Sequence, residues 1–246
     1  MATKKPDAVE RVSNKEIVPA WIQQGDLRGS EHLTPEDVRI PRFSIAQALS
    51  PQITEGDPSF IEGLKNGDAF NDLTGEIYGR GPHKVVFIRA DKPRWLEFDD
   101  DRNIKDFNVK AGDPRTEFRD DPVTGKRLPP IATMFYDYVL VLNDEPMAMS
   151  FKSGGIGEAR RLNGLIRVKP CPIFACFYEL TSMQQKNDQG AWYQFTVKPA
   201  GFVDQDTYKK VERLFEQFKK KEVAFETTPQ SADPDAPDAE KTPGDM

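Results

Sequence analysis

Apolar and polar residues alternate along much of the chain after residue 82, which is the pattern of β-strands with one buried face. A turn at Asp144-Glu145-Pro146 joins two of these segments and predicts a hairpin, and residues 94–98 (RWLEF) are expected to form a second hairpin with residues 83–90. The pattern therefore predicts a mainly β domain. The five principal strand segments are 83–90, 131–143, 147–153, 171–183 and 191–203.

Two segments show the helical spacing of apolar residues instead. Residues 154–167 (GGIGEARRLNGLIR) lie between the third and fourth strand segments and carry an apolar stripe beside several arginines. Residues 207–223 follow the last strand, and either Asp204 or Asp206 is expected to cap this helix. One face of the second helix collects apolar residues for packing on the sheet: Tyr208, Val211, Leu214, Phe215 and Phe218.

Three strands, a helix and two further strands follow each other in the order found in a barrel of the oligonucleotide-binding (OB) type. We therefore expect an α+β fold in which residues 39–225 form an OB-like five-stranded barrel, with residues 99–130 as a polar loop or hairpin insertion. Residues 1–38 lack a sustained period and are expected to be a flexible arm. Residues 226–246 are rich in Pro, Ala and Asp and predict a disordered acidic tail.

The net charge of −6 is concentrated at the C-terminal end. Residues 226–246 contain six acidic residues and one lysine, a charge of −5, which leaves −1 for residues 1–225. Because phosphate attraction depends on local clusters of Lys and Arg, this near-neutral body remains compatible with nucleic-acid binding.

The cysteines and the lack of a long apolar run predict a protein of a reducing, aqueous compartment. Cys171 and Cys176 fall within one predicted strand, five residues apart, so their side chains are expected on opposite faces as reduced core thiols. No apolar run reaches the roughly 18 residues of a membrane span, and we expect a cytoplasmic protein.

Reactive groups are sparse in the sequence, and this favours a protein that is not an enzyme and uses no cofactor or metal. The two histidines, His32 and His83, are not in metal-ligand spacing, and no phosphate-binding lysine motif is present. An alternative function is a metal-dependent nuclease that uses acids of the 99–130 loop. Its candidate residues are Asp99, Asp101, Asp120 and Asp121.

Binding of a single nucleic-acid strand requires aromatic rings that stack on bases and cations that neutralise phosphates. In residues 191–198 the alternation places Trp192, Gln194, Thr196 and Lys198 opposite a core face of Tyr193, Phe195 and Val197. In residues 131–143, the first strand of the predicted hairpin, the alternation of apolar and polar residues leaves two possibilities open. Either Tyr136 and Tyr138 face outward, or Phe135 does. The rings could equally pack in the core, and the arginines could be solvated. The candidates are Trp192, Lys198, Tyr136, Tyr138, Lys152, Arg160, Arg161, Arg94 and Trp95.

Several segments resemble early proteins of tailed bacteriophages, which include OB-fold single-stranded DNA-binding proteins with a charged C-terminal tail. The resemblance covers about residues 40–222 and rests on IPRFSIAQALSPQI, GDAFNDLTGEIYG, YVLVL, KSGGIGEARRL and AWYQFTVKPAGFV. It implies binding of single-stranded DNA without sequence preference, in phage replication or recombination, in the host bacterial cytoplasm. It further implies that the tail contacts replication or recombination proteins. The alternative within the same resemblance is a structural or assembly protein that forms homo-oligomers.

Overall fold

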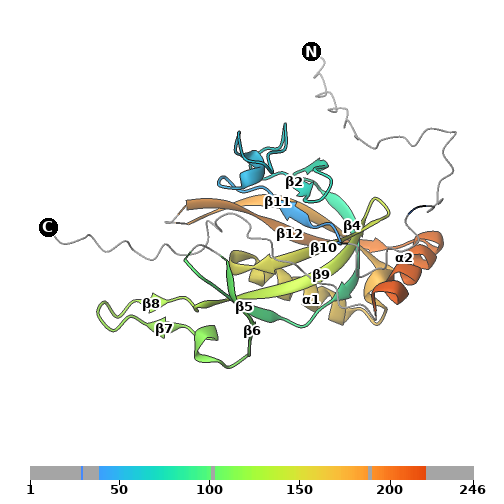
Figure 1. Cartoon of the computed structure of the whole chain (residues 1–246). Helices are drawn as coiled ribbons and strands as arrows, with labels where there is room; N and C mark the ends of the chain where they lie inside the picture. The colour runs from blue at the N-terminus through green and yellow to red at the C-terminus, as the bar shows by residue number, and fades with distance from the viewer. Residues whose placement is uncertain (1–28, 30–38, 101–102, 188–189, 220–246) are drawn as a thin grey trace, which may run out of the picture. The chain divides into compact units, whose positions relative to one another are not determined.

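The computed structural model describes residues 29, 39–100, 103–187 and 190–219 (Figure 1). The chain divides into one unit of residues 1–39 and a second of residues 40–246, and the account below concerns the second. The predicted arm, except Gly29, and the predicted acidic tail lie outside the described residues. None of the described helices is long and apolar enough to cross a membrane.

A seven-stranded antiparallel sheet forms the centre of this unit, so the expectation of a mainly β protein with helices is confirmed (Figure 1). Its strands pair in the order β12-β11-β4-β9-β5-β6, and β10 pairs with the other edge of β9. The strands are β4 (His83–Ala90), β5 (Arg94–Phe98), β6 (Ile104–Val109), β9 (Ala132–Leu142), β10 (Glu145–Lys152), β11 (Cys176–Asn187) and β12 (Gly190–Phe202).

Smaller elements surround this sheet. A three-stranded sheet of β1 (Phe43–Ile45), β2 (Ala69–Asn71) and β3 (Ile77–Gly79) precedes it, and β7 (Arg119–Asp120) pairs with β8 (Arg127–Leu128). Helix α1 (Ile156–Val168) lies between β10 and β11, and α2 (Gln205–Phe218) follows β12. Four 3₁₀ turns complete the described part of the chain: Pro51–Ile53, Pro114–Thr116, Ser153–Gly155 and Ile173–Ala175.

The hairpin predicted between residues 83–90 and 94–98 is wrong. β4 and β5 pair one after the other with the same edge of β9, through Val86 opposite Val141 and Arg94 opposite Phe135. Between them, the backbone N–H of Asp91 donates to the carbonyl of Asp137 at 2.9 Å. The chain therefore continues along β9 instead of reversing.

The predicted closed barrel is not formed. The five strands expected to make it pair as β12-β11-β4-β9-β10, but no ladder joins β10 to β12 in the described residues. Residues 41–47 occupy this position instead. Arg42 bridges Ala148 of β10 in parallel, while the carboxamide of Gln47 accepts from the backbone N–H of Tyr193 at 2.9 Å and donates to its carbonyl at 2.7 Å.

Tyr193 anchors the small sheet to β12. The Arg80 guanidinium lies 4.8 Å from the centre of the Tyr193 ring, and Phe43 stacks on Phe195 at 4.8 Å. Gly67 has φ +90°, and a Cβ there would lie 2.5 Å from the Tyr193 ring. Only glycine fits both the backbone conformation and this close contact.

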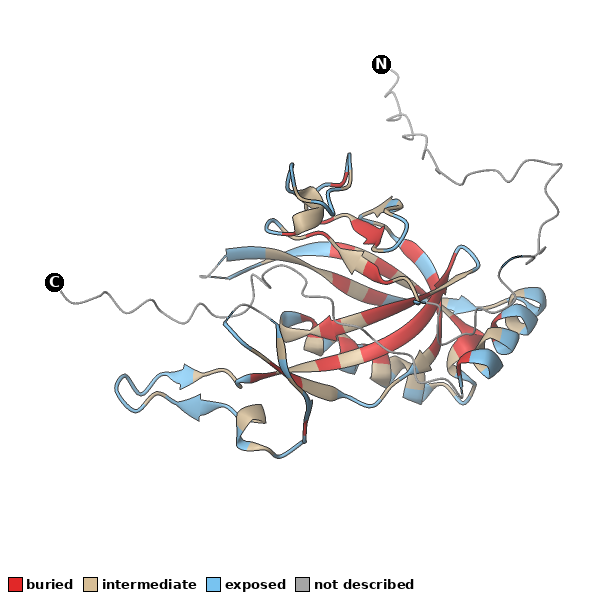
Figure 2. Cartoon of the chain, viewed as in Figure 1, coloured by how far each residue is buried: buried red, intermediate tan, exposed pale blue. Residues whose placement is uncertain are grey.

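β4 and β9 are buried on both faces (Figure 2). On one face, Phe87 and Leu140 join the main core with Leu162 of α1. On the other, Val86 and Val139 pack with Val211 of α2, and we call this second surface the α2 face. The two-sided burial explains the continuous apolar run VVFI in β4, because alternation disappears when both faces are covered.

Helix α2 begins and packs as the sequence predicts. The Asp204 carboxylate accepts from the backbone N–H groups of Asp206 and Thr207, which confirms Asp204 as the cap. At the other end, Arg89 donates to the carbonyl of Phe218 at 2.9 Å, where a cation complements the negative end of the helix dipole. The five predicted apolar residues all pack against the α2 face, with Val211 and Phe218 buried.

The two cysteines are free thiols at the main core, but the expectation that they lie on opposite faces of one strand is wrong. Cys171 precedes β11, a 3₁₀ turn at Ile173–Ala175 separates the two residues, and Cys176 is the first residue of the strand. Their sulfur atoms are 3.9 Å apart. Pro170 and Pro172 lack the N–H groups that a strand at this position would donate, so strand pairing begins only after them.

We predict that Gln47→Ala lowers the free energy of unfolding by about 1 to 3 kcal/mol, because it removes two hydrogen bonds that link residues 41–47 to β12. Urea denaturation followed by circular dichroism measures the change. Gln184→Ala, at an exposed position of β11, is the matched control. Equal stability of the two variants would contradict the assigned role of Gln47.

Candidate nucleic-acid interface

The α2 face extends beyond helix α2 in both directions along the sheet. Strand register places Phe135 on this face, with Arg94 of β5 opposite it on one side and Lys152 of β10 on the other. Towards the other edge of the sheet, Phe177 lies opposite Val86, and alternate residues of β11 and β12 continue the same face. Four sequence candidates therefore share the α2 face: Arg94, Lys152, Trp192 and Lys198.

Arg94 is held by a buried carboxylate. Its guanidinium forms an ion pair with Asp137, which is 1% exposed, and lies 5.3 Å from the centre of the Phe135 ring. Ser150 also donates to Asp137. A buried carboxylate requires such partners, so Arg94 has a structural role whether or not it contacts a ligand. Phe135 is itself buried and offers no free ring face.

A polar strip covers the α2 face of β11 and β12. We call it the β11–β12 strip, and its members pair across the two strands as Gln185 with Trp192, Met183 with Gln194, Thr181 with Thr196, and Glu179 with Lys198. Phe195 and Val197 are buried on the opposite face, so the alternation predicted for residues 191–198 is confirmed for these positions. Lys198 is exposed, and Met183 is 48% exposed. Lys84 of β4 lies opposite Glu179 and extends the strip by one strand.

Two buried polar atoms at one end of the strip lack hydrogen-bond partners among the described residues. They are the Nε1 donor of Trp192 and the Oε1 acceptor of Gln194, two residues apart on one strand face. A buried polar atom without a partner is unusual in a folded protein. The pair offers one donor and one acceptor, which is the chemistry needed to bind the polar edge of a ligand.

A groove of about 550 Å³ lies between α2 and the sheet, next to the strip. Its apolar floor includes Val86, Val141 and Phe177, and its cations are Lys84, Lys210 and Arg213. The Lys84 ammonium lies 3.8 Å from the centre of the Phe177 ring, and Lys210 pairs with Asp144 at 3.7 Å. Such a groove can hold an anionic ligand that also has apolar surface.

Sequence reasoning missed this groove because α2 was interpreted only as a packing helix. Lys210 and Arg213 flank its buried residue Val211 in sequence, and Lys84 precedes Val86 by two positions in the β4 alternation. That two-residue spacing predicts that Lys84 and Val86 share a face of the sheet, and it could have indicated a cation beside an apolar surface. The position of α2 over β4 was not available from the sequence.

Tyr138 lies in the core and is not available for stacking in this structure. It is 1% exposed, and its hydroxyl donates to Oδ1 of Asn163 in α1 at 2.8 Å. Burial raises the pKa of this hydroxyl, so it remains protonated at neutral pH. The physical reason is that α1 covers this face of β9. Phe135, which lies on the other face of β9, is buried too. Neither of the two possibilities left open by the sequence, Tyr136 with Tyr138 or Phe135, therefore exposes a full ring.

The remaining candidates lie away from the β11–β12 strip. Trp95 and Tyr136 are half-buried on the sheet face opposite the α2 face. Arg160 and Arg161 are exposed on α1, and Arg161 pairs with Glu158 at 3.3 Å. The nine sequence candidates therefore do not form one surface.

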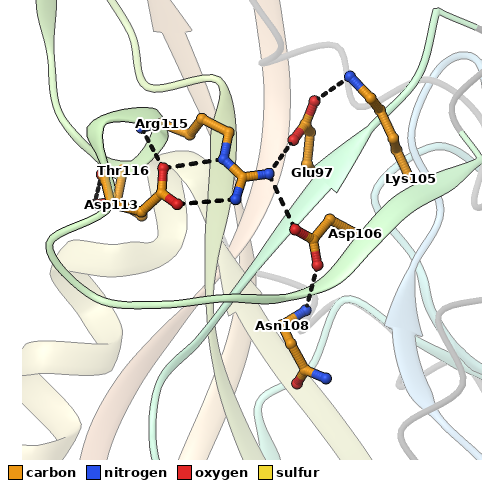
Figure 3. A network of polar contacts seen from close by, with 7 residues as sticks. All are labelled: Glu97, Lys105, Asp106, Asn108, Asp113, Arg115 and Thr116. Carbon is orange, nitrogen blue, oxygen red and sulfur yellow. Dashed lines mark hydrogen bonds and ion pairs between the residues drawn. The ribbon is translucent and has the colours of Figure 1, made fainter.

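The acids near β6 are engaged by Arg115 (Figure 3). Its guanidinium pairs with Asp113 at 2.9 Å, with Glu97 at 2.6 Å and with Asp106 at 3.0 Å. Lys105 adds a contact of 2.5 Å to Glu97. Arg115 therefore holds the connection after β6 against β5 and β6. Among the candidates for a nuclease site, Asp121 accepts from Val123 and Thr124 within its own turn.

The described residues contain no group of three or more side chains placed to hold a metal ion. Asp99 accepts from the backbone N–H of Asn103, Asp120 is exposed on β7, and Asp101 lies outside the described residues. The Asp99, Asp120 and Asp121 side chains thus give no convergent ligand set in the described part of the chain.

Comparison with known proteins identifies a phage protein family. The family model described as Pam3 phage gp34-like protein matches residues 12–224. No curated protein and no solved structure matches the chain. The matched family agrees with the phage resemblance of the sequence, and its description names no activity.

We predict that Arg115→Met destabilises the protein more at neutral pH than in acid. Arg115 lowers the pKa of Asp113 to about 2, and Lys105 together with Arg115 lowers that of Glu97. A lowered folded-state pKa contributes stability above the ordinary carboxyl pKa of about 4, which is lost as pH falls towards 2. The difference in unfolding free energy between wild type and variant should therefore shrink between pH 5 and pH 2.

Urea denaturation across that pH range measures this difference, with Arg119→Met at an exposed position of β7 as the control. A difference that stays constant with pH would show that Arg115 acts through packing of its side chain and not through these carboxylates.

Proposed function

The chain belongs to the Pam3 phage gp34-like family, and on that premise we propose that it binds single-stranded DNA without sequence preference in phage DNA replication or recombination. The proposed role is non-enzymatic. The observation that carries it is the β11–β12 strip, which continues into the groove beneath α2 and combines an indole ring with lysine and arginine side chains on one sheet face. Stacking rings and cations in one groove are the two requirements for binding a single strand.

Strand order supports the same proposal. In an OB barrel the first strand lies between the second and the fourth, and a helix commonly connects the third to the fourth. Here β4 lies between β9 and β11, and α1 connects β10 to β11. We therefore propose an OB-like fold that is opened between its third and fifth strands and completed by residues 41–47.

The length of the strip suits a short stretch of nucleic acid. On β11 the strip runs from Glu179 to Gln185, which are six residues apart, and at about 3.3 Å per residue it is about 20 Å long. Single OB folds bind from about 4 nucleotides upwards, so a strand lying along the strip and entering the groove would reach this size.

The proposed path of DNA carries positive side chains, and two acidic residues beside them offset part of this charge. Lys198, Lys84, Lys210 and Arg213 lie along it, while Glu179 is between two of the lysines and Asp144 pairs with Lys210. We therefore expect binding that depends strongly on salt. Residues 226–246, with a charge of −5, are proposed to compete with DNA for these cations and to contact replication or recombination proteins.

A second candidate function is phage assembly through protein contacts. Phe107 of β6, Phe118 before β7 and Val123 in the β7–β8 turn are all strongly exposed, although Arg127 covers one side of the Phe118 ring at 4.5 Å. Exposed apolar side chains within a short stretch of the chain favour a protein partner. A stable homo-oligomer that does not respond to oligonucleotides would support this function instead.

We predict that Trp192→Ala weakens binding of single-stranded DNA by about 1 to 3 kcal/mol, the loss expected for one stacked base. Fluorescence titration with a labelled oligonucleotide at low salt measures Kd. Phe60→Ala removes a partly exposed ring outside the strip and is the matched control. If the folded Trp192 variant binds as tightly as wild type, Trp192 is not part of the site.

We predict that Lys84→Gln together with Lys198→Gln lowers affinity and reduces the slope of log K against log salt by about 0.7 for each lysine. Lys65→Gln together with Lys92→Gln, at two exposed positions outside the strip, is the control with the same change in charge. The titration uses single-stranded DNA, single-stranded RNA and duplex DNA of equal length. Failure of wild type to bind any of them at low salt would refute the proposed function.

A further inference from the structure

The two cysteines of the chain lie side by side at the start of β11. Cys171 is in the connection after α1, Cys176 is the first residue of the strand, and their sulfur atoms are 3.9 Å apart. A disulfide has a sulfur–sulfur distance of about 2.05 Å, so closing one requires a movement of about 2 Å by the two side chains. The residues between them form a 3₁₀ turn that already brings the two ends together.

The surroundings of the two thiols differ in a way that assigns them separate roles. Cys171 is half-buried and accessible to a small reagent, whereas Cys176 is 1% exposed and belongs to the main core. The Lys169 ammonium lies 3.3 Å from the Cys176 sulfur. A nearby cation stabilises a thiolate, which is the reactive form of cysteine.

We propose that Cys171 and Cys176 form a reversible redox site that is oxidised by small disulfides of the glutathione type. Cys171 is the residue that reacts first with the disulfide in solution, and Cys176 is the resolving residue that closes the internal disulfide. The proposal rests on the placement of the two thiols and Lys169, and it is independent of the proposed DNA binding.

The reaction is two successive thiol–disulfide exchanges. The Cys171 thiolate attacks one sulfur of glutathione disulfide, the bond between the two glutathione sulfurs breaks, and one glutathione leaves as its thiolate. The Cys176 thiolate then attacks the Cys171 sulfur, the internal bond forms, and the second glutathione leaves. Two electrons pass from the protein to one glutathione disulfide, and the protons of the two cysteines end on the two departing thiolates.

The first exchange should become faster as pH rises. Burial and the neighbouring Cys176 thiol raise the pKa of Cys171 above its ordinary value, although Lys169 opposes this shift. Cys171 is therefore mostly protonated at neutral pH, and its thiolate fraction grows as pH approaches the raised pKa. The internal disulfide would tie the connection after α1 to the first residue of β11, and both cysteines pack against the same core.

The test uses the full chain in glutathione buffers of increasing oxidised fraction, followed by acid quenching, blocking of free thiols with a maleimide under denaturing conditions, and intact mass measurement. Wild type should lose two hydrogens and retain no glutathione. Cys176→Ser should retain one glutathione on Cys171, whereas Cys171→Ser should gain glutathione many-fold more slowly. Lys169→Met keeps the aliphatic stem but removes the ammonium, and it should make the mixed disulfide accumulate.

Three outcomes would overturn the proposal: wild type that keeps glutathione without closing the internal bond, equal modification of the two single variants, or two free thiols even in fully oxidised glutathione. Because serine at the buried position could destabilise the core, Cys176→Ala provides a second version of the same variant. Circular dichroism confirms that each variant is folded before it is compared.

Discussion

Burial of β4 and β9 on both faces is the constraint on which the rest of the structure depends. Four consecutive apolar residues, Val85 to Ile88, send two side chains to each face of the sheet. Apolar area on both faces must be removed from water, so the sheet requires a cover on each side. Helix α1 and residues 41–47 supply one cover, and α2 supplies the other.

The two covers also determine where a ligand can bind. α2 lies over β4 and β9 and removes that part of the sheet from contact, whereas most residues of the β11–β12 strip on the same face remain partly exposed. Because the helix does not fill the space above Val86, Val141 and Phe177, a groove remains at its edge. The cations that line this groove come from both the helix and the strands, so the groove exists only when α2 is docked.

Positive charge is used in two different ways in this fold. Arg94 and Arg115 neutralise carboxylates and thereby hold β5, β6 and their connections in place. Lys84, Lys198 and Arg213 lie on the surface along the proposed path of DNA, where Glu179 and Asp144 weaken their attraction for phosphate. A count of basic residues cannot separate these two uses, because the distinction depends on which carboxylate lies within contact distance of each cation.

The sequence by itself determined the five principal strand segments, both helices and the alternation of residues 191–198, and it limited the cap of α2 to Asp204 or Asp206, because these features depend on neighbours within one turn or one strand. It did not predict β6, which lies in the segment expected to be a loop or hairpin insertion and pairs with β5. Strand partners were decided only by tertiary structure. Residues 94–98 pair with β9 and not with β4, residues 41–47 lie where barrel closure was expected, and Cys171 approaches Cys176 through a turn that two prolines allow. The burial of Tyr138 and the groove beneath α2 likewise arise from the docking of helices, since a residue's exposure depends on which element covers its face, and periodicity identifies only the face.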